Sequence, residues 1–105
     1  MNQRIKIGFM DSGIGGLSVL SYAMKIFPEA HYIYYADTDN VPYGTKTKDE
    51  IIKYADRAVD FLVKKGVAAI VVACNTATSM AIAYLREKYR GVHIVGMEPA
   101  VKPAA

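Results

Sequence analysis

The chain has 105 residues, of which 52% are hydrophobic and 22% charged, a composition typical of a folded globular domain rather than of a disordered segment. Its longest apolar run falls well short of the roughly 18 residues that a transmembrane helix needs, and its first residues lack the apolar core of a signal peptide, so we expect a cytoplasmic protein with no membrane contact. The net charge of +3 comes from lysines and arginines dispersed among acidic residues, a pattern that argues against nucleic acid as a partner.

The first third of the sequence predicts a strand, a loop and a helix. Residues 5–10 are mostly apolar and predict a strand ending at Asp11, and residues 11–16 form a glycine-rich loop. This loop has neither the spacing of a dinucleotide-binding loop nor the lysine of a phosphate-binding loop, so we expect tight packing from its glycines rather than nucleotide binding. The next segment predicts a helix that ends at Pro28. Its expected apolar face consists of Leu17, Leu20, Met24 and Phe27.

A second strand, a loop and a second helix follow. Residues 31–36 predict a strand whose tyrosines, Tyr32, Tyr34 and Tyr35, we interpret as packing residues. The proline and glycine of Pro42-Tyr43-Gly44 predict a loop. Thr47 and Glu50 match a capping box, which predicts a helix start, and Gly66 is suited to follow its end. The residues that we expect this helix to bury are Ile52, Ala55, Val59 and Leu62.

The only cysteine stands at a predicted junction between strand and helix. Residues 67–73 are small or β-branched and predict a parallel strand buried on both faces. Cys74 ends this run, and residues that can cap a helix follow it: Asn75, Thr76 and Thr78. A last strand is predicted over residues 92–97. The alternation of strands and helices predicts an α/β fold, with a parallel sheet of about four strands between flanking helices in three layers (αβα).

In a parallel sheet the carboxyl ends of the strands lie at one edge, where open α/β sheets bind ligands. The polar residues that follow the predicted strands should therefore form one site. These residues are Asp11, Ser12, Asp37, Tyr43, Gly44, Cys74, Asn75, Thr76 and Glu98.

Cys74 is either an inert packing residue or the reactive group of this site. A nucleophile activated by histidine is not expected, because His31 and His93 fall at the amino ends of their strands. A redox pair would need a second cysteine where Ala77 stands, and a phosphatase loop an arginine where Met80 stands. The remaining chemistry is a thiolate that accepts a proton, which the positive end of a helix favours. One cysteine also excludes an internal disulfide and a cysteine-based zinc cluster, and we expect no metal.

The other candidates each have a structural and a functional interpretation. The Tyr43 hydroxyl and Gly44 N–H either hold a substrate carboxylate or belong to an ordinary turn. Asn75 and Thr76 either cap the helix or donate to substrate. Asp11 is harder to explain as packing, because a carboxylate at the end of a buried strand is costly without a partner.

Four segments together resemble the first half of a glutamate racemase, within the aspartate/glutamate racemase superfamily, and the resemblance spans essentially the whole chain. Their motifs are Asp11-Ser12-Gly13, Pro42-Tyr43-Gly44, Cys74-Asn75-Thr76 and Met97-Glu98-Pro99. The resemblance implies one half of a pseudo-symmetric two-domain fold that inverts the α-carbon of glutamate without a cofactor, supplying D-glutamate for peptidoglycan.

The resemblance also implies residue roles. Such enzymes place two cysteines on opposite faces of the α-carbon, and Cys74 matches the first of them. Asp11 and Ser12 match residues near the substrate ammonium, with Asp11 also assisting the cysteine. The remaining matches are substrate contacts, at Tyr43, Gly44, Asn75 and Thr76.

The chain departs from the family pattern in lacking the opposing base, which the family carries on a C-terminal domain. Residues 1–97 are expected to form the N-terminal domain, and residues 98–105 the start of a linker. One thiol cannot both accept and donate on opposite faces, so we expect half a site with little or no activity. A homodimer facing its own Cys74 would restore two thiols. The alternatives are another amino-acid racemase, such as an aspartate racemase, or a non-catalytic amino-acid-binding domain.

Overall fold

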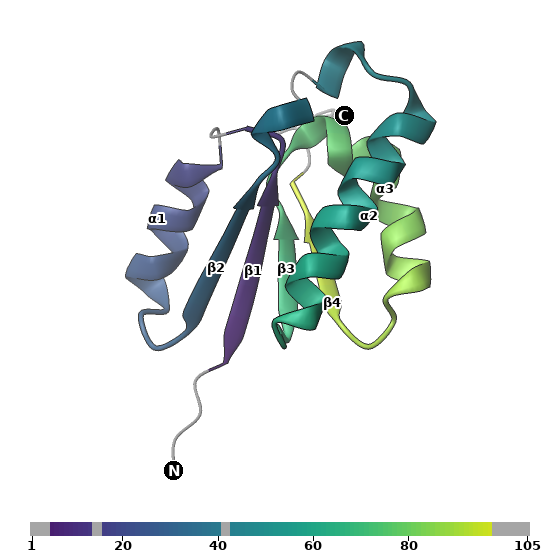
Figure 1. Cartoon of the computed structure of the whole chain (residues 1–105). Helices are drawn as coiled ribbons and strands as arrows, with labels where there is room; N and C mark the ends of the chain where they lie inside the picture. Colours follow the sequence, from purple (N-terminus) through teal and green to yellow (C-terminus); the bar gives the residue numbers. More distant parts are fainter. Residues whose placement is uncertain (1–4, 14–15, 41–42, 98–105) are drawn as a thin grey trace, which may run out of the picture.

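In the computed structural model, which describes residues 5–13, 16–40 and 43–97, four parallel strands form one sheet in the order β2-β1-β3-β4, with helices on both faces (Figure 1). This confirms the predicted α/β architecture. The expected linker, residues 98–105, and parts of the two loops, residues 14–15 and 41–42, lie outside the described residues. The elements are β1 (Lys6–Asp11), α1 (Leu17–Ile26), β2 (His31–Ala36), α2 (Lys48–Lys64), β3 (Ala69–Val72), α3 (Asn75–Lys88) and β4 (His93–Gly96), with short 3₁₀ turns at Thr38–Asn40 and Tyr43–Thr45.

The strand register aligns the carboxyl ends of all the strands. Met10 of β1 pairs with Val72 of β3, and Val72 pairs with Gly96 of β4. On the other side of β1, Asp11 pairs with Ala36 of β2. The loops that follow β1, β2 and β3 therefore leave the sheet side by side at one edge, as the sequence predicts.

The capping box and the glycine that follows α2 are both present. Thr47 Oγ1 accepts a hydrogen bond from Glu50 N at 3.1 Å, and Glu50 Oε1 accepts one from Thr47 N at 2.9 Å. After the helix, Gly66 adopts a φ of 84°, a left-handed conformation that favours glycine. Local sequence signals thus define both ends of this helix.

The main hydrophobic core lies between the sheet and the pair α2 and α3. Both helices stand on the same face of the sheet (Figure 1). Leu62 of α2 contacts Gly8 of β1, where a Cβ would meet its methyl carbons at 3.1 Å. Ile51, rather than the predicted Ile52, is fully buried in this helix, and Ile52 is only half-buried against the core. The other core residues from this helix are Ala55, Ala58, Val59 and Leu62.

The opposite face of the sheet is only partly covered, because α1 is the one helix described on that side and stands near β2 (Figure 1). No residue of α1 is buried, so its predicted apolar face is not a core face. Burial alternates along β3, where Ile70 and Val72 are buried and Val71 is partly exposed. The prediction that this strand is buried on both faces is therefore wrong. Val95 of β4, on the same open face, is 51% exposed.

Among the described residues, no helix combines the length and apolarity needed to cross a membrane.

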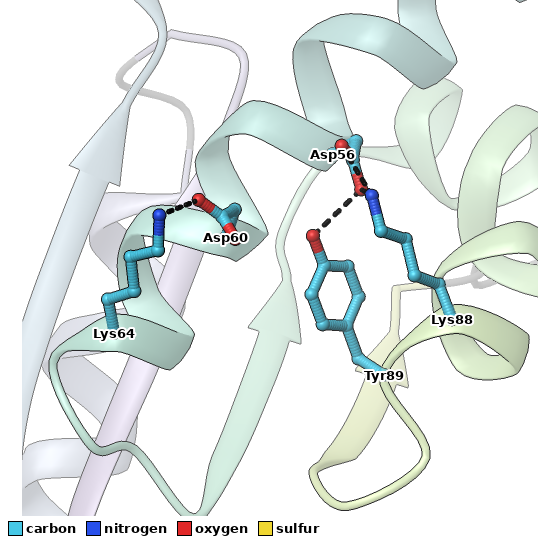
Figure 2. Close-up of polar contacts among 5 residues, drawn as sticks. All are labelled: Asp56, Asp60, Lys64, Lys88 and Tyr89. Carbon is cyan, nitrogen blue, oxygen red and sulfur yellow. Dashed lines mark hydrogen bonds and ion pairs between the residues drawn. The ribbon is translucent and has the colours of Figure 1, made fainter.

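A polar cluster joins α2 to the end of α3 (Figure 2). Asp56 of α2 forms an ion pair with the Lys88 ammonium at 3.0 Å and accepts a hydrogen bond from the Tyr89 hydroxyl at 2.8 Å. Asp60 forms an ion pair with Lys64 along the same helix. Burial, and then the hydrogen bond to Asp56, raise the pKa of Tyr89 from its ordinary 10.0 to about 12. The hydroxyl is therefore a donor throughout the neutral range and links the two helices.

We predict that Tyr89→Phe lowers the free energy of unfolding by about 1 kcal/mol near neutral pH, because it removes this hydrogen bond. The pKa of Tyr89 is raised in the folded chain, so its contribution is complete below pH 10.0 and is lost as the pH rises through about 12. Urea unfolding of the unchanged chain and of Tyr89→Phe, measured from pH 10.0 to about 12, should show the difference between their free energies of unfolding decreasing. A difference that stays constant to pH 12 would contradict this account.

Candidate active site

Backbone hydrogen bonds between neighbouring strand ends bring the candidate residues together. Asp37 N donates to Asp11 O at 2.8 Å, joining the ends of β2 and β1. Ala73 N donates to Met10 O at 2.7 Å, joining β3 to β1 one residue before Cys74. The predicted convergence of these loops on one edge is therefore present for the part of the chain that the structure describes.

Cys74 is the N-cap residue of α3. Its backbone is extended, with φ −133° and ψ 122°, and its Sγ accepts a hydrogen bond from Ala77 N at 3.5 Å. Of the two interpretations of Asn75 and Thr76, the N-cap role is not theirs, nor that of Thr78, because the cysteine sulfur takes it. Thr78 is instead buried, and its hydroxyl donates to Val72 O at 3.2 Å.

The Cys74 thiol also contacts the loop after β1. It donates to Ser12 Oγ at 3.1 Å, and the thiol is half-buried rather than enclosed by hydrocarbon. A hydroxyl can donate as well as accept, so Ser12 can return a hydrogen bond to the sulfur once the thiol proton leaves. Two donors, the Ala77 amide and the Ser12 hydroxyl, are thus placed to stabilise a thiolate.

Asp11 is 3% exposed, and the protein supplies the partners that a buried carboxylate requires. Its Oδ1 accepts from Ser12 N at 2.8 Å, and its Oδ2 accepts from Gly16 N and from the Tyr34 hydroxyl, the latter at 2.8 Å. Burial and this hydrogen bond raise the pKa of Tyr34 above its ordinary value, so the phenol remains a donor. The interpretation of Tyr34 as a packing residue missed this contact, because nothing in the sequence pairs the two positions.

Tyr43 is turned into the protein and is 2% exposed. Its hydroxyl donates to Asp37 Oδ2 at 2.5 Å, and Asn40 Nδ2 donates to the other oxygen of the same carboxylate at 2.9 Å. Burial, then Asp37 and, less strongly, the nearby charge of Cys74 raise the pKa of Tyr43. The Tyr43 hydroxyl, one of whose two interpretations was to hold a substrate carboxylate, is thus occupied by Asp37.

The other predicted contacts lie at the same edge. Gly44 is exposed, and a Cβ added there would meet nothing within 4 Å. Asn75 and Thr76 form the first turn of α3, the former exposed and the latter half-buried. The first turn of a helix presents backbone N–H groups that have no partner within the helix, which suits it to an anionic ligand group.

The two histidines lie elsewhere, as predicted. His31 begins β2 and His93 begins β4, at the amino ends of their strands. A shallow cavity of about 320 Å³ near His31, lined by Met24, Pro28, Ala30, His31 and Tyr32, contains no predicted site residue. Within the described ranges, no group of three or more His, Cys, Asp or Glu side chains could hold a metal ion.

Comparison with known proteins finds the chain similar to glutamate racemases. No protein-family model matches the chain. The chain is 68% identical over 100 residues to a glutamate racemase of Lachnospira eligens, covering 95% of this chain and 37% of that protein. It is 60% identical to a glutamate racemase of Halothermothrix orenii, covering 95% of this chain and 39% of that protein.

Solved structures give the same result. A structure of Escherichia coli glutamate racemase in complex with L-glutamate and the activator UDP-MurNAc-ala superposes with a TM-score of 0.90 at 39% identity, covering 97% of this chain and 38% of that chain. The glutamate racemase of Aquifex pyrophilus superposes with a TM-score of 0.84 at 43% identity, covering 88% and 36%. The chain thus spans a little over a third of the length of the proteins it matches.

We predict that Gly16→Ala destabilises the chain and displaces Asp11. An added Cβ would lie 2.8 Å from Ala73 Cβ and 2.9 Å from Asp11 Oδ2, so the loop and the carboxylate must move apart, at a cost of about 1–3 kcal/mol. Gly91→Ala is the matched control, because its Cβ would meet nothing within 4 Å and should change stability by less than about 0.5 kcal/mol. Equal unfolding midpoints in urea for the two variants would refute this packing constraint.

Proposed function

The chain is a homologue of the glutamate racemases over a little over a third of their length, and on that premise we propose that it forms the glutamate-binding half of a racemase site with one base, Cys74. The observation that supports this most strongly is the position of the thiol. Its sulfur caps a helix at the carboxyl edge of the sheet and lies 3.1 Å from Ser12 Oγ, in the loop that also positions Asp11.

The proposed reaction begins with proton removal from the α-carbon of glutamate. The Cys74 thiolate accepts this proton on its sulfur, and the electron pair of the broken C–H bond remains on the α-carbon and delocalises into the α-carboxylate. Hydrogen bonds to the sulfur from Ala77 N and the Ser12 hydroxyl stabilise the thiolate before transfer. Return of a proton to the opposite face completes the inversion.

We further propose where the substrate groups bind. The ammonium is assigned to Asp11, the buried carboxylate in the same loop as Ser12. The substrate carboxylates are assigned to backbone N–H groups at Gly44 and at the first turn of α3, with the Asn75 and Thr76 side chains as further donors. In this proposal the Tyr43 hydroxyl does not contact the substrate, because it is bound to Asp37. Tyr43 instead helps to hold the turn that carries the Gly44 N–H.

The resemblance implies a second cysteine as the opposing base, and it must come from outside this 105-residue chain, because Cys74 is its only cysteine. We propose that a further racemase domain supplies it, with a second copy of the chain as the other possible source. In this proposal the whole enzyme acts in the cytoplasm and supplies D-glutamate for peptidoglycan.

We predict that glutamate protects Cys74 from alkylation. If substrate binds over the sulfur, glutamate at ten times its dissociation constant should slow the reaction with iodoacetamide about tenfold. Aspartate, one methylene shorter, should protect only at higher concentration, and succinate, which lacks the ammonium, should protect least. Mass spectrometry of the alkylated chain over time measures the rate. Equal rates with and without glutamate would contradict the proposed site, and stronger protection by aspartate would favour an aspartate racemase.

A further inference from the structure

Tyr34 lies beside the site but outside the set of residues that the resemblance assigns to glutamate. It belongs to β2 and pairs with Phe9 of β1, so its side chain lies on the same face of the sheet as Asp11, two residues beyond Phe9. The phenol extends along this face toward the carboxyl edge, where its hydroxyl donates to Asp11 Oδ2 at 2.8 Å.

The two oxygens of Asp11 are not equally occupied. An ionised carboxylate can accept about four hydrogen bonds, two at each oxygen. Counting donors from residues 5–13, 16–40 and 43–97, Oδ2 accepts two hydrogen bonds, from Gly16 N and the Tyr34 hydroxyl, whereas Oδ1 accepts one, from Ser12 N. With respect to the described donors, the remaining acceptor position of the carboxylate is on Oδ1, the oxygen that accepts from Ser12 N. The hydroxyl of the same Ser12 contacts Cys74.

We propose that Tyr34 is a positioning residue of this site, which occupies Oδ2 of Asp11 and so leaves Oδ1, beside Ser12 and Cys74, as the oxygen that receives the substrate ammonium. This inference rests on the proposed function for the identity of the ligand. The geometry of the three donors around the carboxylate is independent of it.

Loss of the Tyr34 hydroxyl would remove one of the described donors to Oδ2 of Asp11. Without the Tyr34 hydroxyl, Oδ1 keeps Ser12 N and Oδ2 keeps Gly16 N as donor, so both oxygens can accept from a ligand and Oδ1 is no longer favoured. The ring of phenylalanine fills nearly the same space as that of tyrosine, so the change removes a donor and creates little cavity.

The test compares Tyr34→Phe with Tyr32→Phe in the 105-residue chain. Tyr32 is the matched control, because it lies on the same strand and face and its hydroxyl donates to Phe27 O at 2.7 Å, away from the site. Both variants lose one hydrogen-bonded phenol. The first readout is the glutamate concentration that halves the rate of Cys74 alkylation by iodoacetamide. The second is the chemical shift of the Ser12 and Gly16 amide protons, measured by NMR without ligand.

We expect Tyr34→Phe to raise the half-protecting glutamate concentration about tenfold and to move both amide signals, with Tyr32→Phe matching the unchanged chain in both readouts. Equal protection in the two variants overturns the positioning role and leaves the proposed function intact. If glutamate fails to protect even the unchanged chain, the proposed function fails, and the amide signals decide the inference about Tyr34. Signals in Tyr34→Phe that match those in Tyr32→Phe overturn it.

Discussion

The site depends on the pairing of β1 with β3. This pairing sets Met10 against Val72 and is extended by the hydrogen bond from Ala73 N to Met10 O, at 2.7 Å. It places the residues after β1 next to the residues after β3, although they are about 60 positions apart in the chain. In this register Cys74 comes level with Ser12, and a shift by one residue would turn the side chains of β3 to the other face of the sheet and end that alignment. The contact between Ser12 and Cys74 is a consequence of this register.

Two buried carboxylates occupy neighbouring strand ends, and each has a tyrosine as partner. Tyr34 donates to Asp11 and Tyr43 donates to Asp37. A carboxylate at such a position would be costly without donors, and both tyrosines have a raised pKa that keeps them protonated. The two tyrosines thereby fix the orientation of each carboxylate close to the thiol, an arrangement that suits the ammonium group of a ligand.

Much of this fold could be predicted from the sequence, because its signals are local. The capping box of Thr47 and Glu50 defines the start of α2, and the alternation of apolar strands and helices defines a parallel sheet whose carboxyl ends meet. The convergence of Asp11 and Cys74 on one edge followed from the same rule, since Asp11 ends β1 and Cys74 comes shortly after β3. Side-chain partners could not be predicted, because the partners of Tyr34 and Tyr43 depend on tertiary distances. The exposure of α1 was missed for a related reason: an apolar helix face indicates what a helix can bury and not whether anything covers it.

In the proposed reaction this chain carries one base of two. The most direct measurement incubates the chain, shown to be monomeric by sedimentation, with L-glutamate in deuterium oxide, and follows both the α-proton signal and the configuration of the recovered amino acid. A single thiol on one face predicts that the glutamate keeps its L configuration. Rapid deuterium incorporation with full conversion to the racemate by the monomer would contradict the account.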